Sequence, residues 1–242
     1  MTWRPLPLAA ALLLGISAPA LAQSQQPVTA TSPDGSIAVT VSIDGEGFVT
    51  YQVARKGEAI IAPSRLGFLF TDQDPMARGQ RLDDHQISAK KETWEQPWGE
   101  RRFVTDNHTE LTLNISGPTI NDAMVDAPQR RAYTLRFRIF DNGVGFRTEF
   151  PVRGDGKPWA IADERSEFVL ARPGTAWWIQ GGDWNRYEQI YRTSAIDAVG
   201  TAHTPITMKL DNGTHLSFHE AALIDYAAMW FKRVEGQRFV ST

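Results

Sequence analysis

Apolar and polar residues alternate along most of the chain from residue 32 onward. In residues 37–43, isoleucine and valine occupy every second position, and alanine, threonine and serine fill the positions between them. Because successive side chains of a β-strand point to opposite faces of its sheet, such a run predicts a strand with one buried face. The same alternation recurs in residues 49–53, 111–115, 133–139, 146–150, 206–210 and 216–218.

Turn sequences separate these runs. Asp-Asn-Gly occurs at residues 141–143 and again at residues 211–213. Glycine and asparagine tolerate the positive φ angles of tight turns, so each triplet is expected to join two antiparallel strands. The expected hairpins are formed by residues 131–140 with 144–151 and by residues 205–210 with 214–219.

Many short strands with frequent turns predict an all-β fold. We expect a large antiparallel β-sandwich, with one helical stretch over residues 184–195. No internal repeat of fixed period and no linker interrupts the pattern. The simplest organisation is therefore a single domain over residues 32–242.

The first 22 residues have the features of a secretory signal. Arg4 gives a positively charged start, residues 8–16 form a short apolar run, and Ala20-Leu21-Ala22 is a small-x-small cleavage site. The apolar run is too short for a membrane span, which needs about 20 apolar residues. We expect cleavage after Ala22, a flexible leader over residues 23–31, and a periplasmic or secreted product without a transmembrane segment.

Composition and charge argue against several kinds of function. The 242 residues include 25 Lys and Arg against 28 Asp and Glu, a formal net charge of −3, which gives no support for a nucleic-acid partner. The absence of Cys excludes disulfides, thiolate zinc sites and cysteine nucleophiles. Neither a Gly-x-Ser-x-Gly nucleophile turn nor a glycine-rich nucleotide-binding motif occurs.

Glu220 is the most informative carboxylate. If the strand that begins near residue 214 continues this far, Glu220 shares a face with Leu216 and Phe218. A carboxylate on an apolar face needs a partner, which here would be an arginine, a metal ion or an active-site pocket. Alternatively the strand ends at His219 and Glu220 lies in solvent.

Residues 177–188 are rich in aromatic side chains. Trp184, Asn185 and Tyr187 are candidates for sugar binding, because aromatic faces stack on sugar rings and amide groups bond sugar hydroxyls. The alternative is an ordinary core cluster beside a glycine turn. A second aromatic cluster over residues 94–102 has the same two interpretations, and its Pro97-Trp98-Gly99 turn favours a structural role.

Taken together, these segments resemble the N-terminal domain of glycoside hydrolase family 97. No single motif is specific, but five occur in the expected order over nearly the whole chain from Ser32. The matching segments are residues 94–100, 107–111, 140–147 with 149–151, 184–191, and 219–223 with 225–226.

The resemblance implies an exported bacterial enzyme that cleaves α-linked glucosides or galactosides. It also implies an N-terminal β-super-sandwich of the galactose-mutarotase-like class, followed by a catalytic (β/α)₈ barrel and a small β domain. Family members hold a calcium ion among carboxylates, one of which comes from the N-terminal domain. The position that matches this ligand is Glu220, and calcium suits a carboxylate because it is a hard cation with oxygen ligands.

The chain departs from the family pattern because it stops at Thr242, before any barrel. Glycoside cleavage needs two carboxyl groups that flank the bond, and no residue of this chain can be assigned to either role. The inverting or retaining outcome is therefore open. One alternative is a stand-alone carbohydrate-binding sandwich, which would expose Trp178, Trp184 or Tyr187. Another is a purely structural module. If a barrel partner exists, we expect a large exposed apolar patch near Glu220.

Overall fold

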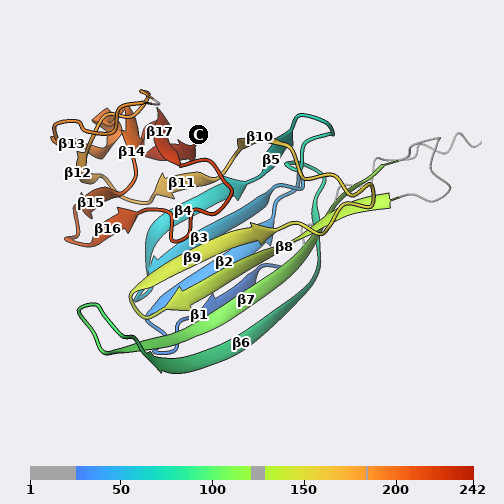
Figure 1. Ribbon diagram of the computed structural model, residues 1–242, viewed down its shortest axis with the longest axis horizontal. Helices are drawn as coiled ribbons and strands as arrows, with labels where there is room; N and C mark the ends of the chain where they lie inside the picture. The colour runs from blue at the N-terminus through green and yellow to red at the C-terminus, as the bar shows by residue number, and fades with distance from the viewer. Residues whose placement is uncertain (1–25, 121–128, 184) are drawn as a thin grey trace, which may run out of the picture.

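The computed structural model describes residues 26–120, 129–183 and 185–242 (Figure 1). The predicted signal and its cleavage site therefore lie outside the described residues. Within the described part of the chain, no helix is both long enough and apolar enough to cross a membrane.

Strands make up nearly all of the regular structure in these ranges, with one short 3₁₀ helix at Ile196–Ala198. The strands are β1 (Val28–Thr31), β2 (Ile37–Ile43), β3 (Val49–Arg55), β4 (Glu58–Leu66), β5 (Phe68–Phe70), β6 (Arg81–Glu95), β7 (Phe103–Ile120), β8 (Gln129–Phe140), β9 (Gly143–Glu149), β10 (Ile161–Glu164), β11 (Glu167–Leu170), β12 (Gly174–Trp178), β13 (Arg192–Ala195), β14 (Thr201–His203), β15 (Ile206–Leu210), β16 (His215–Phe218), β17 (Trp230–Glu235) and β18 (Arg238–Ser241).

Most of the described strands pack in two layers, and β5 and β10 pair as a separate two-stranded sheet. One layer is an eight-stranded sheet in the order β1-β2-β3-β4-β11-β18-β17-β14, and the other contains two four-stranded sheets, β6-β7-β8-β9 and β13-β12-β15-β16. Aromatic contacts join both small sheets to the large one, since the ring centroids of Tyr51 and Phe137 lie 5.9 Å apart and those of Phe168 and Phe218 lie 5.5 Å apart. The strands pair antiparallel, and the predicted all-β antiparallel sandwich is confirmed.

Both predicted hairpins form. β8 and β9 pair so that Phe137 lies opposite Phe146, and β15 and β16 pair so that Met208 lies opposite Leu216. The two Asp-Asn-Gly triplets lie at the corresponding turns. The alternation and the turn chemistry together were sufficient to specify these elements.

The helix expected over residues 184–195 is not formed. Arg192–Ala195 is β13, which pairs with β12 so that Arg192 lies opposite Trp178. Residues 185–191 form neither helix nor strand. In β13 the backbone N–H and C=O groups form hydrogen bonds with β12, whereas in a helix they would bond to each other within the same segment.

The flexible leader predicted over residues 23–31 does not extend to residue 31. Residues 28–31 were expected to belong to a flexible leader, but they form β1, which pairs with β2. Val28 and Ala30 are buried against the core, whereas Thr29 and Thr31 are exposed. This short alternation extends the sandwich to the N-terminal side of residue 32.

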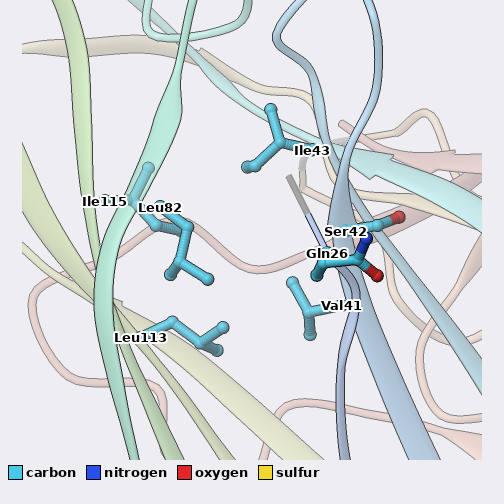
Figure 2. Close-up of a pocket in the computed structure, with 7 residues that line it drawn as sticks. All are labelled: Gln26, Val41, Ser42, Ile43, Leu82, Leu113 and Ile115. Carbon is cyan, nitrogen blue, oxygen red and sulfur yellow. The ribbon is translucent and has the colours of Figure 1, made fainter. Parts of the chain in front are cut away.

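The apolar interior closes tightly at the end of the sandwich near β1. Figure 2 shows Val41 and Ile43 of β2 facing Leu82, Leu113 and Ile115 of the opposite layer. The space between these side chains is too narrow to admit a water molecule. This crevice is therefore part of the packed core and offers no room for a ligand.

Charged residues form a ladder on the outer face of the small sheet that contains β7, β8 and β9. The guanidinium of Arg136 donates to Glu110 at 2.6 Å and to Glu149 at 3.1 Å, and that of Arg138 donates to Glu110 at 3.3 Å. Hydrogen bonds from Arg136 lower the pKa of Glu149, and a hydrogen bond from Arg147 lowers it further. Burial raises this pKa, but the lowering effects are larger. The arginines therefore belong to a solvated, charge-balanced face.

We expect Arg136→Met to make stability less dependent on pH in the acidic range. Because the folded-state pKa of Glu149 is lowered, its contribution is present above the ordinary carboxyl pKa and is lost as the pH falls through the folded value. At pH 7 the variant should be less stable by about 1 kcal/mol, since the network is partly exposed. Urea unfolding at pH 7 and pH 3.5 measures this difference, which should shrink at the lower pH. An equal difference at both pH values would refute the expectation.

Candidate functional site

Glu220 lies at the junction of the two layers. β16 ends at Phe218, and the alternation continues beyond it, because Leu216, Phe218 and Glu220 are half-buried while the residues between them are exposed. The Thr204 hydroxyl donates to one Glu220 carboxylate oxygen at 2.6 Å, and the Met229 backbone N–H donates to the other. The predicted orientation of Glu220 is correct, but its partners are neither an arginine nor solvent.

The carboxylate of Glu220 is held in its ionised form. Burial raises its pKa, but the hydrogen bonds from Thr204 and Met229 outweigh this effect, and the pKa lies below its usual value. A carboxylate that accepts two donors on fixed strand ends is charged at neutral pH and restricted in orientation. It therefore presents a permanent negative charge at this edge of the domain.

Tyr187 is connected to Glu220 through a single residue. The Tyr187 hydroxyl donates to the Thr204 carbonyl at 3.2 Å, and the Thr204 side chain in turn donates to Glu220. The ring of Tyr187 packs on His203 with centroids 4.8 Å apart, yet its side chain remains 52% exposed. The structure thus brings two of the sequence-predicted site residues together.

The other two predicted sugar-binding residues are not placed in this group. Asn185 is exposed, and no hydrogen bond of its side chain occurs among the described contacts. Trp184 lies outside the described residues. The sequence indicated this segment but not which of its side chains approach Glu220.

Sequence reasoning missed His203, Thr204 and Met229. His203 is buried between Tyr187 and Trp230, and its Nε2 atom has no hydrogen-bond partner among the described residues. Thr204 lies between β14 and β15, and Met229 precedes β17. These positions approach Glu220 only through the tertiary fold, and no local pattern marks them.

Several exposed apolar side chains lie close in the chain to Tyr187 and Glu220. Ile190 is 88% exposed and Ile224 is 78% exposed, and both lie in segments without regular structure. Tyr191 and Leu223 are exposed beside them in the chain. Large apolar side chains in this arrangement are typical of a surface that another domain or protein covers. Exposed apolar residues thus occur near Glu220 in the chain, and the large apolar patch expected on this side of the domain stays a prediction.

Comparison with known proteins identifies the family. Residues 30–241 match the family described as Glycosyl-hydrolase 97 N-terminal. The chain belongs to this family. The match spans all of the layers described above, so the resemblance seen in the separate sequence motifs is confirmed.

Relatives in this family are much longer than the chain. A glycoside hydrolase family 97 enzyme from Pseudoalteromonas sp. strain K8, solved with acarbose and as an E480Q variant with panose, is 36% identical, with a TM-score of 0.81 over 89% of this chain and 31% of its own. A probable retaining α-galactosidase from Streptomyces bingchenggensis is 30% identical over 69% of this chain and 24% of its own length. The chain therefore spans about a quarter to a third of these proteins.

The calcium site implied by the family can be tested against the residues of this chain. Within the described residues, no group of three or more His, Asp or Glu side chains is placed to hold a metal ion. Glu220 supplies one carboxylate, whose oxygens retain lone pairs beyond the two hydrogen bonds that they accept. The chain thus fits calcium as the source of one ligand and does not build a complete site in its described part.

The aromatic platform expected of a stand-alone sugar-binding sandwich is not provided by Trp178. Its side chain is 4% exposed, its indole N–H donates to the Ser194 hydroxyl, and the Arg192 guanidinium lies 5.3 Å from its ring centroid. In the second aromatic cluster, Trp98 is 82% exposed at the tip of the β6–β7 hairpin. That tip is ordered by the Gln96 amide, which donates to the Arg101 carbonyl at 2.8 Å.

Proposed function

We propose that the chain is the N-terminal domain of an exported glycoside hydrolase and packs on a catalytic (β/α)₈ domain. The observation that carries this proposal is the family match over residues 30–241, in a chain that spans 31% of the solved family 97 enzyme from Pseudoalteromonas. The exposed apolar side chains of residues 190–191 and 223–224 support it, because a second domain would cover them. Export rests on the signal features of residues 1–22.

We propose further that Glu220 contributes one ligand to a calcium ion shared with that catalytic domain. The carboxylate is ionised, fixed by Thr204 and Met229, and lies beside the exposed apolar segments. Calcium bound there would supply a local positive charge at the domain junction. The role of this chain at that site is to hold the Glu220 carboxylate in place.

The proposed substrate is an α-glucoside or α-galactoside. The names of the relatives support it, since one is a probable retaining α-galactosidase and another was solved with acarbose and panose. Trp184, Asn185 and Tyr187 are the proposed sugar contacts of this domain. Of these, Tyr187 is supported by its connection to Glu220 through Thr204.

Turnover assays on two proteins test the proposal. Residues 26–242 alone should not hydrolyse p-nitrophenyl α-glucoside or p-nitrophenyl α-galactoside, because no pair of carboxyl groups in this chain is assigned to the reaction. The full-length protein that joins this chain to the proposed catalytic domain should hydrolyse at least one of them. Hydrolysis by residues 26–242 alone would contradict the proposal.

A further inference from the structure

A cleft of about 450 Å³ opens between the two small sheets. The walls are the two turns with the first residues of β9 and β16. The floor is formed by side chains of β2, β3, β4 and β11 together with Phe146 of β9 and Phe218 of β16. In Figure 1, β9 (yellow) and β16 (orange-red) are edge strands of the two small sheets, and β3 and β4 lie near them. The volume lies within the range of about 300–1,000 Å³ that is usual for small-molecule sites.

Both Asp-Asn-Gly turns are fixed at the mouth of this cleft. The carboxylate of Asp141 accepts the backbone N–H of Asp34 at 2.9 Å, which ties the β8–β9 turn to the β1–β2 turn. The amide of Asn212 donates to Glu58 at 2.8 Å, which ties the β15–β16 turn to the start of β4. The walls are therefore anchored to the large sheet, and the opening is built into the fold.

The floor of the cleft is apolar and partly aromatic. Phe146 packs on Tyr51 with ring centroids 5.4 Å apart, and Phe218 packs on Phe168. Phe146 and Phe218 remain half-exposed, together with Val144, whereas Phe137 in the neighbouring strand is fully buried. These three side chains keep exposed apolar surface that a neighbouring strand would cover in a continuous sheet. A ligand with an apolar face would bury this surface.

The rim is polar, and four of its side chains are unpaired within the described residues. The lining side chains of Arg55, Asn142, His215 and Ser217 make no hydrogen bond or ion pair in the described part of the structure. These groups supply both donors and acceptors. Asp141 adds a carboxylate to the same rim, so the charges of Arg55 and Asp141 offset each other. A rim of this kind suits a ligand that is neutral and rich in hydroxyl groups.

We propose that this cleft binds a short neutral saccharide. A pyranose ring has an apolar C–H face for the Phe146 and Phe218 side of the floor, and a ring of hydroxyls for the polar rim. Membership of a glycosyl-hydrolase family favours a saccharide over other neutral polar molecules. The proposal goes beyond the docking and calcium roles described above and requires neither of them.

The two turns provide a matched pair of variants. Asn142 lines the cleft, whereas Asn212 holds the same position in the other Asp-Asn-Gly turn, bonds Glu58 and does not line it. We would titrate isotope-labelled residues 26–242 with maltotriose and, separately, melibiose, and follow the amide signals by NMR. For at least one sugar, signals of residues 141–146 and 214–218 should shift. Asn142→Ala should weaken binding by about two- to tenfold through the loss of its hydrogen bonds, and Asn212→Ala should not.

Three results would overturn the proposal. The first is no shift for either sugar up to about 50 mM, which lies well above a millimolar dissociation constant. The second is a set of shifts confined to other residues, such as 185–191. The third is equal weakening by the two asparagine variants. Because the titration uses neither calcium nor a catalytic domain, its failure would leave the function proposed above untouched.

Discussion

Glu220→Gln is expected to lower the calcium affinity of the proposed full-length enzyme by at least about tenfold, because Glu220 is the ligand proposed for this domain. The substitution keeps the shape of the side chain but replaces a charged oxygen ligand with a neutral amide. In the domain itself, the two carboxylate oxygens accept hydrogen bonds from Thr204 and Met229. Glutamine has a single acceptor oxygen, so it would keep one of these hydrogen bonds equally well and lose the other. The cost to folding should therefore be about 1 kcal/mol, far less than the loss of calcium binding.

Calorimetric titration with calcium measures the affinity directly, and kcat/KM at saturating calcium gives a second readout. The matched control is Glu188→Gln, which removes an exposed carboxylate from the neighbouring aromatic segment. Glu188→Gln should leave the calcium affinity within about twofold of the unsubstituted enzyme. An unchanged affinity for Glu220→Gln, or an equal drop for Glu188→Gln, would disprove the role of Glu220 as a ligand.

Phe231→Ala is expected to destabilise the domain by about 3–5 kcal/mol. Phe231 in β17 is fully buried, and its ring centroid lies 5.0 Å from those of Phe168 and Phe218 and 4.8 Å from that of Phe239. This cluster joins the large sheet to β16, so truncation would leave a cavity between the layers. The loss is a large part of the stability of a typical domain, which is about 5–15 kcal/mol.

Urea unfolding followed by tryptophan fluorescence measures this loss. Val234→Ala, in the same strand but exposed, is the control and should change the stability by no more than about 0.5 kcal/mol. A loss below about 1 kcal/mol for Phe231→Ala would show that the two layers do not pack through this cluster.

Burial of one face made some strands predictable from the sequence, but short strands such as β1 were missed even though they alternate. β2 was predicted because its seven residues alternate between buried and half-buried positions. β6 is exposed along nearly its whole length, so its sequence carries no alternation and the strand was not predicted. β13 was mistaken for part of a helix because four residues are too few to show a period.

The candidate site was also only partly predictable from the sequence. The orientation of Glu220 followed from its spacing to Leu216 and Phe218, because side-chain direction is a local property of a strand. Its partners could not be predicted, since Thr204 and Met229 come from other parts of the chain and meet Glu220 only in the folded domain. The cleft between β9 and β16 was missed for the same reason, because it arises where two separate sheets fail to join.

Amide hydrogen exchange, compared between residues 26–242 alone and the full-length protein, tests the central claim most directly. If this chain docks on a catalytic domain through the surface around Glu220, residues 185–191 and 219–229 should exchange at least about tenfold more slowly in the full-length protein. The exposed β6 strand provides an internal reference for a surface outside that interface. Equal exchange of residues 185–191 and 219–229 in the two proteins would contradict the account.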